Sequence, residues 1–161
     1  MIVGLAVGGA LGIAGTFVTD DHVRAVLWAI DGVALIVATA LLALHYFRKG
    51  QDAVAAGFLV YAIGEAVMLG GTAGGPIVSV PAFAAGTALW AAALLMTSIP
   101  AAFALWTRAA AIIGAVLFAS TSLAIFAGKP LTQLTRPLPY FAYPFLVLTF
   151  VGWIVAVMRE P

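Results

Sequence analysis

The sequence predicts an all-α protein, a polytopic bundle of about six transmembrane helices joined by short loops. Two observations lead to this fold class. Apolar residues make up 65% of the 161 residues and charged residues only 8%, whereas soluble domains have about 45–50% and about 25%. The apolar residues also gather into six runs of about 20 residues, the length that crosses a bilayer core. A water-soluble globule is thereby excluded.

The six runs are taken as one integral membrane domain covering residues 1–161, with no soluble domain. Each run is bounded by polar residues, glycine or proline, which start or end helices. The predicted spans are 2–18, 23–47, 53–71, 80–98, 109–127 and 138–158.

The breaks between the spans carry local signals. The polar break 19–22 precedes the second span, and an aspartate there would cap that helix and complement its dipole. Gly50 suits the end of the second helix, and Asp52 suits the N-cap of the third. Pro81 is tolerable in the first turn of the fourth span, and Pro100 ends that span. We expect residues 100–108 to lie in the membrane interface.

Basic residues and the even number of spans suggest an orientation in the cell membrane. Six spans place both termini on one side, together with Arg48, Lys49, Arg108 and Arg159. The opposite side holds three basic residues, Arg24, Lys129 and Arg136. Because cytoplasmic loops are enriched in Lys and Arg, both termini are predicted to be cytoplasmic.

Two acids lie well inside predicted spans, Asp31 in the second and Glu65 in the third. Counted at about 1.5 Å per residue, Asp31 lies about 24 Å above the inner end of its span and Glu65 about 18 Å. On antiparallel neighbours, the two carboxyl groups would lie within one or two turns of each other. Charges in hydrocarbon are costly, so such groups face the bundle interior and are paired, protonated or hydrated.

Three further side chains complete the predicted pocket. Tyr61 lies one turn before Glu65, Trp28 lies nearly one turn before Asp31, and Arg24 shares the Asp31 face. An alternative of equal weight is structural. Asp31 would then pair with Arg24, Arg136 or a backbone amide, and Glu65 would be a neutral acid hydrogen-bonded between helices.

Other chemistry finds little support in the sequence. Cysteine is absent, which excludes disulfides, thiolate metal sites and c-type haem attachment. His22 and His45 are predicted at opposite membrane faces, which disfavours haem ligation, and Asp20 and Asp21 are interpreted as capping residues rather than metal ligands. No catalytic motif is present, so an enzyme is the least supported class, no cofactor is expected, and nucleic-acid binding is excluded.

Gly4, Gly8 and Gly12 recur every four residues and form a ridge of small side chains on the first helix. Such a ridge allows close helix approach, either within the chain or in a homo-oligomer or membrane complex.

Two functions fit these features. The first is a small transporter-like or ligand-binding protein that uses Asp31 as a fixed negative charge and Glu65 as a proton-exchanging group, for a proton, a cation or a cationic solute. The alternative is a non-catalytic accessory or assembly subunit of a larger membrane complex.

Overall fold

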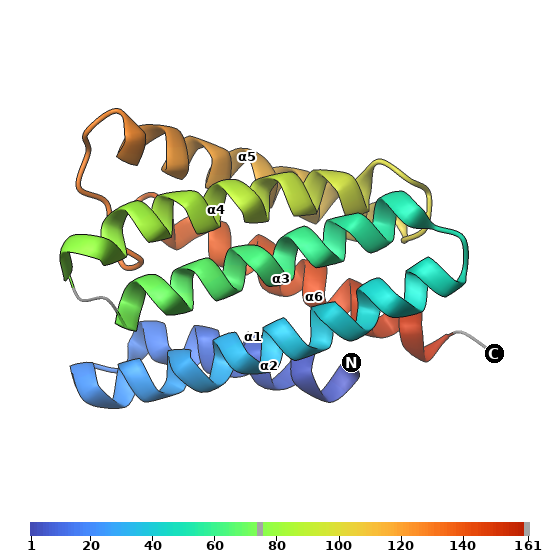
Figure 1. The fold of residues 1–161 in the computed structure, drawn as a ribbon, viewed down its shortest axis with the longest axis horizontal. Coiled ribbons are helices and arrows are strands. Elements are labelled where there is room, and N and C mark those ends of the chain that lie inside the picture. The colour runs from blue at the N-terminus through green and yellow to red at the C-terminus, as the bar shows by residue number, and fades with distance from the viewer. Residues whose placement is uncertain (74–75, 160–161) are drawn as a thin grey trace.

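The computed structural model describes residues 1–73 and 76–159, and within that part the chain forms six α-helices lying roughly along one axis (Figure 1). The helices and one short 3₁₀ turn are α1 (Ile2–Phe17), α2 (Asp21–Arg48), α3 (Asp52–Ala73), α4 (Pro76–Ser98), α5 (Leu105–Phe126), η1 (Tyr140–Ala142) and α6 (Tyr143–Met158).

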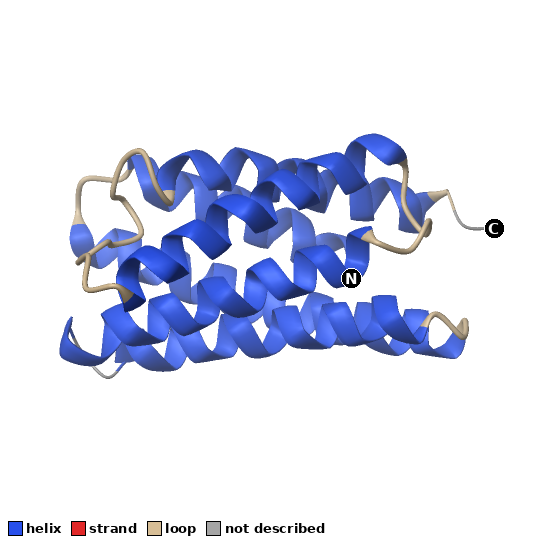
Figure 2. Cartoon of the chain, turned by 90° about the horizontal axis from the view of Figure 1, so that it is seen from above, coloured by secondary structure: helices blue, strands red, loops and turns tan. Residues whose placement is uncertain are grey.

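The helices form a closed ring. Each helix packs against the next one in the chain, and α6 returns to pack against α1. The first residues of α1, the end of α6 and the α2–α3 and α4–α5 loops lie at one end of the bundle, here called the terminal end (Figures 1 and 2). Helices α1, α3 and α5 finish at the opposite end, here called the far end. Consecutive helices are therefore antiparallel, as the sequence predicts.

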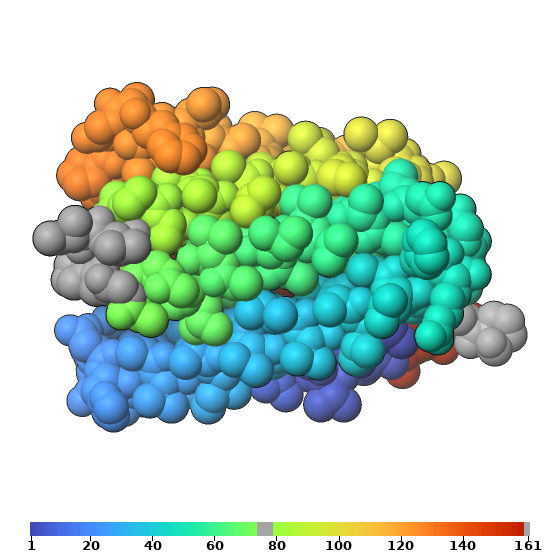
Figure 3. Space-filling model, in the orientation of Figure 1, coloured from blue at the N-terminus to red at the C-terminus, as the bar shows by residue number. Residues whose placement is uncertain are grey.

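The exterior of the ring is apolar. Five segments are long and apolar enough to cross a membrane, namely α2, α3, α5 and residues Ser79–Ser98 and Tyr140–Met158. Helix α1 has 16 residues and rises about 24 Å. Large apolar side chains such as Val33, Leu44 and Leu123 are exposed on the outer faces, and α2 to α5 lie side by side on one face (Figure 3). Such a surface suits lipid rather than water, so the predicted helical membrane bundle is confirmed.

Glycines with positive φ end two helices in the same way. Gly50 has φ +68° and follows α2, and Gly128 has φ +90° and follows α5. In each turn the glycine N–H and the next N–H donate to carbonyl groups of the last helical turn, at 2.9–3.0 Å. This is the Schellman motif, and Gly50 ends its helix as predicted.

Helix starts differ from the predicted boundaries. The Asp20 side chain accepts from Val23 N at 2.9 Å, so α2 begins at Asp21 rather than at residue 23. Asp52 is the first residue of α3 rather than its N-cap. Proximity of carboxylates to helix N-termini is favourable in both positions.

Helices α4 and α5 also extend beyond their predicted starts. Helix α4 begins at Pro76, so Pro81 lies inside it rather than in its first turn. Helix α5 begins at Leu105, four residues before the predicted start, and shortens the expected interfacial stretch. The early start places Arg108 in the first turn, where it donates to Ser98 O at 2.6 Å and to Ile99 O at 3.1 Å. These carbonyl groups at the end of α4 have no partners within that helix.

Aromatic side chains fill the ring towards the terminal end. The Phe58 and Trp153 ring centroids lie 4.7 Å apart, and the Tyr61 ring stacks on Trp90 at 5.5 Å with an interplanar angle of 3°. We call this set the aromatic cluster; its members are Tyr46, Phe58, Tyr61, Trp90, Phe103, Phe118, Phe150 and Trp153. It joins α2, α3, α4, α5, α6 and the α4–α5 loop and closes the interior on that side.

Candidate functional site

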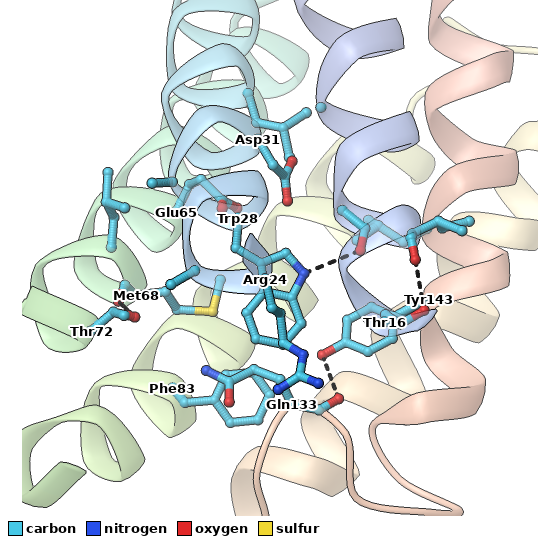
Figure 4. Close-up of a pocket in the computed structure, with 18 of the residues that line it drawn as sticks. Thr16, Arg24, Trp28, Asp31, Glu65, Met68, Thr72, Phe83, Gln133 and Tyr143 are labelled. Carbon is cyan, nitrogen blue, oxygen red and sulfur yellow. Dashed lines mark hydrogen bonds between the residues drawn. The ribbon is translucent and has the colours of Figure 1, made fainter. Parts of the chain in front are cut away.

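The interior of the ring is hollow towards the far end. A cavity of about 660 Å³ lies between α1, α2, α3, α4 and α6 (Figure 4). Its mouth at the far end is lined by polar side chains, including Asp21, Arg24, Thr72 and Gln133. Cavities of about 300–1,000 Å³ are the size that holds organic ligands.

Asp31 of α2 borders this cavity opposite the ridge of α1. A Cβ atom at Gly12 would lie 2.8 Å from Asp31 Oδ2, and one at Gly8 would lie 3.2 Å from Oδ1. The ridge glycines therefore make the space in which the carboxyl group sits. The Oδ1 atom is buried and has no hydrogen-bond partner.

Glu65 of α3 borders the same cavity from the next helix. Its side chain is 7% exposed, and Oε2 has no hydrogen-bond partner. A Cβ at Gly32, the neighbour of Asp31 on α2, would lie 3.4 Å from Oε1. The expectation that the two acids come close on adjacent helices agrees with this geometry, and each carries an unpaired, buried oxygen.

Arg24 is engaged at the cavity mouth. Its guanidinium group pairs with Asp21 and donates from Nη2 to Val18 O and from Nε to Gly15 O at 3.3 Å. Arg24 thus satisfies the last carbonyl groups of α1, which have no partners within that helix. Its guanidinium group makes no ion pair with Asp31 in the part of the chain described.

Arg136, the other basic partner considered for Asp31, stacks over the Tyr140 ring at 4.2 Å. Between the described residues, the single ion pair is that of Arg24 with Asp21. The structural alternative that pairs Asp31 with a nearby arginine therefore lacks support in the geometry.

The two predicted aromatic residues have different positions. Trp28 lines the cavity, and its Nε1 donates to Gly12 O at 3.2 Å (Figure 4). Gly15 leaves room for the indole, since a Cβ there would lie 2.3 Å from Trp28 Nε1. Tyr61 is fully buried in the aromatic cluster and is not part of the cavity wall; its hydroxyl group has no hydrogen-bond partner.

Sequence reasoning confined the pocket to the first three helices and missed two walls. Helix α4 contributes Phe83 and Trp90, and α6 contributes Tyr143 and Phe150. Tyr143 Oη donates to Gln133 O at 3.1 Å and ties the α5–α6 loop to the mouth. Trp90 offered the one usable signal, because it is the single aromatic residue between positions 84 and 100, a run rich in alanine.

Trp90 of α4 lines the same cavity as Glu65 and carries an N–H donor on its indole ring. Its indole Nε1 is buried and has no hydrogen-bond partner. The floor of the cavity therefore combines acceptors on Asp31 and Glu65 with an unpaired donor on Trp90.

The glycine ridge packs within the chain. A Cβ at Gly4 would lie 2.8 Å from Ala34 O and from Ala38 Cβ, and one at Gly8 would lie 2.4 Å from Leu35 Cδ2. Helix α2 of the same chain therefore covers the face formed by Gly4, Gly8 and Gly12. Assembly with a partner through that face remains a prediction.

Metal-ligating residues do not converge among the described residues, where no group of three or more His, Asp or Glu side chains is placed to hold an ion. His22 lies in the first turn of α2 and His45 in its last turn, at opposite ends of the bundle.

Comparison with protein-family models, with characterised proteins and with solved structures finds no significant match to this chain.

Proposed function

We propose that this membrane protein binds a proton, a cation or a cationic solute in the cavity, in the manner of a small transporter or a ligand-binding protein. The observation that carries the proposal is the floor of the cavity, where Asp31 and Glu65 each present a buried oxygen without a hydrogen-bond partner. A buried acceptor without a partner has lost its hydrogen bonds to water and forms none with the protein, which destabilises the folded state.

Charge balance supports a cation. Among the described lining residues, Arg24 is the one basic side chain, and it is engaged at the mouth by Asp21 and the end of α1. A carboxylate in the membrane is stabilised by a paired charge, by water or by protonation. Because no basic side chain among the described residues pairs with Asp31 or Glu65, the proposed ligand is a proton or a cation that enters the cavity.

The proposed orientation makes the cavity accessible from outside the cell. The terminal end carries Arg48, Lys49, Arg108 and Arg159, and the excess of basic residues there supports a cytoplasmic position in the cell membrane. The aromatic cluster separates the cavity from that end. This arrangement corresponds to an outward-open binding site in which Asp31 is the fixed charge and Glu65 exchanges the proton or cation.

The second candidate is an accessory subunit of a larger membrane complex, which the apolar exterior favours. In this case the acids would serve packing, and stable partners would copurify in fixed stoichiometry.

Thermal unfolding of the purified protein in a non-ionic detergent separates the two functions. The panel contains the chlorides of lithium, sodium, potassium, magnesium, calcium, methylammonium and phenylethylammonium at matched ionic strength. A ligand at 100 times its Kd stabilises the folded state by about 2.7 kcal/mol. We expect at least one cation to raise the midpoint of the wild type, and Asp31→Asn and Glu65→Gln to remove that rise.

Asp52→Asn is the matched control, because Asp52 is an exposed acid at the terminal end. It should respond to cations as the wild type does. Identical midpoints for all proteins in every salt, together with a copurifying partner, would overturn the binding function in favour of the accessory one.

A further inference from the structure

Resting on the proposed function, we infer the class of ligand: an amphiphilic organic cation with N–H donors, such as an aryl-alkyl primary ammonium. The ammonium group would lie between Asp31 and Glu65, and the apolar body would extend towards the mouth.

The polar floor selects for N–H donors. The unpaired acceptors Asp31 Oδ1 and Glu65 Oε2 come from two neighbouring helices and border one space. A primary ammonium carries three N–H groups and can donate to both at once, and such charge-assisted hydrogen bonds are strong. A quaternary ammonium has no N–H and leaves both oxygens unsatisfied.

A divalent metal ion fits this floor poorly. Calcium takes six to eight oxygen ligands and magnesium six, and no third acidic side chain joins Asp31 and Glu65 in the described residues. The neighbours on the floor are instead aromatic, including Trp90 and Phe150. Aromatic faces attract organic cations, most strongly where water is excluded.

The walls between the floor and the mouth select for an apolar body. They include Ile13, Trp28, Met68, Leu69 and Phe83. Seven residues of α2 separate Asp31 from Arg24, a rise of about 10 Å, so the apolar section is long enough for a ring or short chain. Methionine adapts to irregular ligands, and the volume of about 660 Å³ far exceeds that of an ion.

Binding to a set of matched probes tests this inference. The probes are 2-phenylethylammonium, its N,N,N-trimethyl analogue, 2-phenylethanol, methylammonium and sodium, with Kd measured by isothermal titration calorimetry on the full chain in lipid nanodiscs. We expect phenylethylammonium to bind about tenfold or more tightly than the trimethyl analogue and the alcohol, the factor that hydrogen bonds to a charged group provide. Glu65→Gln and Asp31→Asn should remove this preference.

The apolar wall has its own variant. Phe83→Ala should weaken phenylethylammonium and leave methylammonium unchanged, because the smaller ion does not reach the wall. If an acid variant fails to fold, Ala25→Leu substitutes for it, since Ala25 lies in the exposed part of the cavity lining. A leucine there should weaken phenylethylammonium more than methylammonium.

The outcomes separate this inference from the proposed function. Glu65-dependent binding of sodium or methylammonium without binding of phenylethylammonium overturns the ligand class and keeps the cation site. Equal affinity for the trimethyl analogue or for the alcohol also overturns the ligand class. Failure of every cation to bind overturns both.

Discussion

The interior of the ring is packed with side chains in one half and hollow in the other. Towards the terminal end, the aromatic cluster fills the interior, and Trp153 and Phe58 are no more than 1% exposed. Towards the far end, glycines on α1 and small residues on α2 leave a cavity bordered by two acids. The same six helices thus form a packed half, which fixes their positions, and a hollow half, which is lined by Asp31 and Glu65. Packing stabilises the first half, whereas the second half contains buried oxygens of Asp31 and Glu65 that have no hydrogen-bond partner.

Loss of a tryptophan should produce the largest difference between the halves. Trp153→Ala removes a side chain that contacts Phe58, Tyr61 and Phe150, and should lower the free energy of unfolding by about 3–5 kcal/mol. Trp28→Ala removes a half-buried ring and one hydrogen bond to Gly12 O, and should cost about 2 kcal/mol. Unfolding by a denaturing detergent, followed by circular dichroism, measures both. Equal losses would show that the far half is packed as firmly as the terminal half.

A larger side chain should destabilise the packed half and have little effect on the free energy of unfolding in the hollow half. Ala93 is fully buried where α4 meets α3, so Ala93→Leu overpacks the interface and should cost about 1–3 kcal/mol. Ala25 lines the cavity, so Ala25→Leu should change the free energy of unfolding by less than about 0.5 kcal/mol. The same unfolding assay applies, and a large loss in Ala25→Leu would contradict the presence of free space beside α2.

Glycine substitutions sharpen the comparison on the ridge. A Cβ at Gly8 would lie 2.4 Å from Leu35 Cδ2 and 2.5 Å from Cγ, so Gly8→Ala should cost about 1–2 kcal/mol by forcing α1 away from α2. Gly70 has open space around the added atom, and Gly70→Ala should stabilise α3 by up to about 1 kcal/mol. Thermal midpoints that move in opposite directions are the expected result. A loss in both variants would point to a general intolerance of side chains rather than to close packing on the ridge.

The ion pair at the mouth should matter least. Asp21 is 92% exposed where it pairs with Arg24, and exposed pairs contribute about 0–1 kcal/mol. Asp21→Asn should therefore lower the thermal midpoint only slightly, and less so in high salt, because salt screens exposed charges. If Asp21→Asn lowered the thermal midpoint as much as Gly8→Ala does, the ion pair would contribute more to stability than exposed pairs do, and this prediction would be wrong.

Particular residues show which features of the fold could be predicted from the sequence. The apolar runs identified every helix, because a bilayer requires a minimum length of apolar chain. The position of Gly50 at a helix end followed from its φ freedom. The starts of α4 and α5 were misplaced, because proline and arginine are compatible with several positions near a helix start. For Arg108, the deciding contact is with the end of α4, ten residues earlier in the chain.

The candidate site divides in the same way. Asp31 and Glu65 were identified from their depth in apolar segments, since acids there are uncommon and costly. Arg24 was assigned to the same helical face as Asp31, but its guanidinium group turns to the carbonyl groups of α1. Tyr61 was placed correctly one turn from Glu65 and yet lies in the aromatic cluster. Periodicity gives the face of a helix, whereas the direction and partner of a long side chain depend on its neighbours.

The sequence alone determined that this protein is a helical membrane bundle, which segments form its helices and which acids lie within them. These properties depend on local composition and on the length of chain that crosses hydrocarbon. The tertiary structure decided that the helices close into a ring, that glycines of α1 make room for Asp31, and that α4 and α6 complete the cavity. These properties depend on contacts between segments far apart in the chain, and no local pattern specifies them.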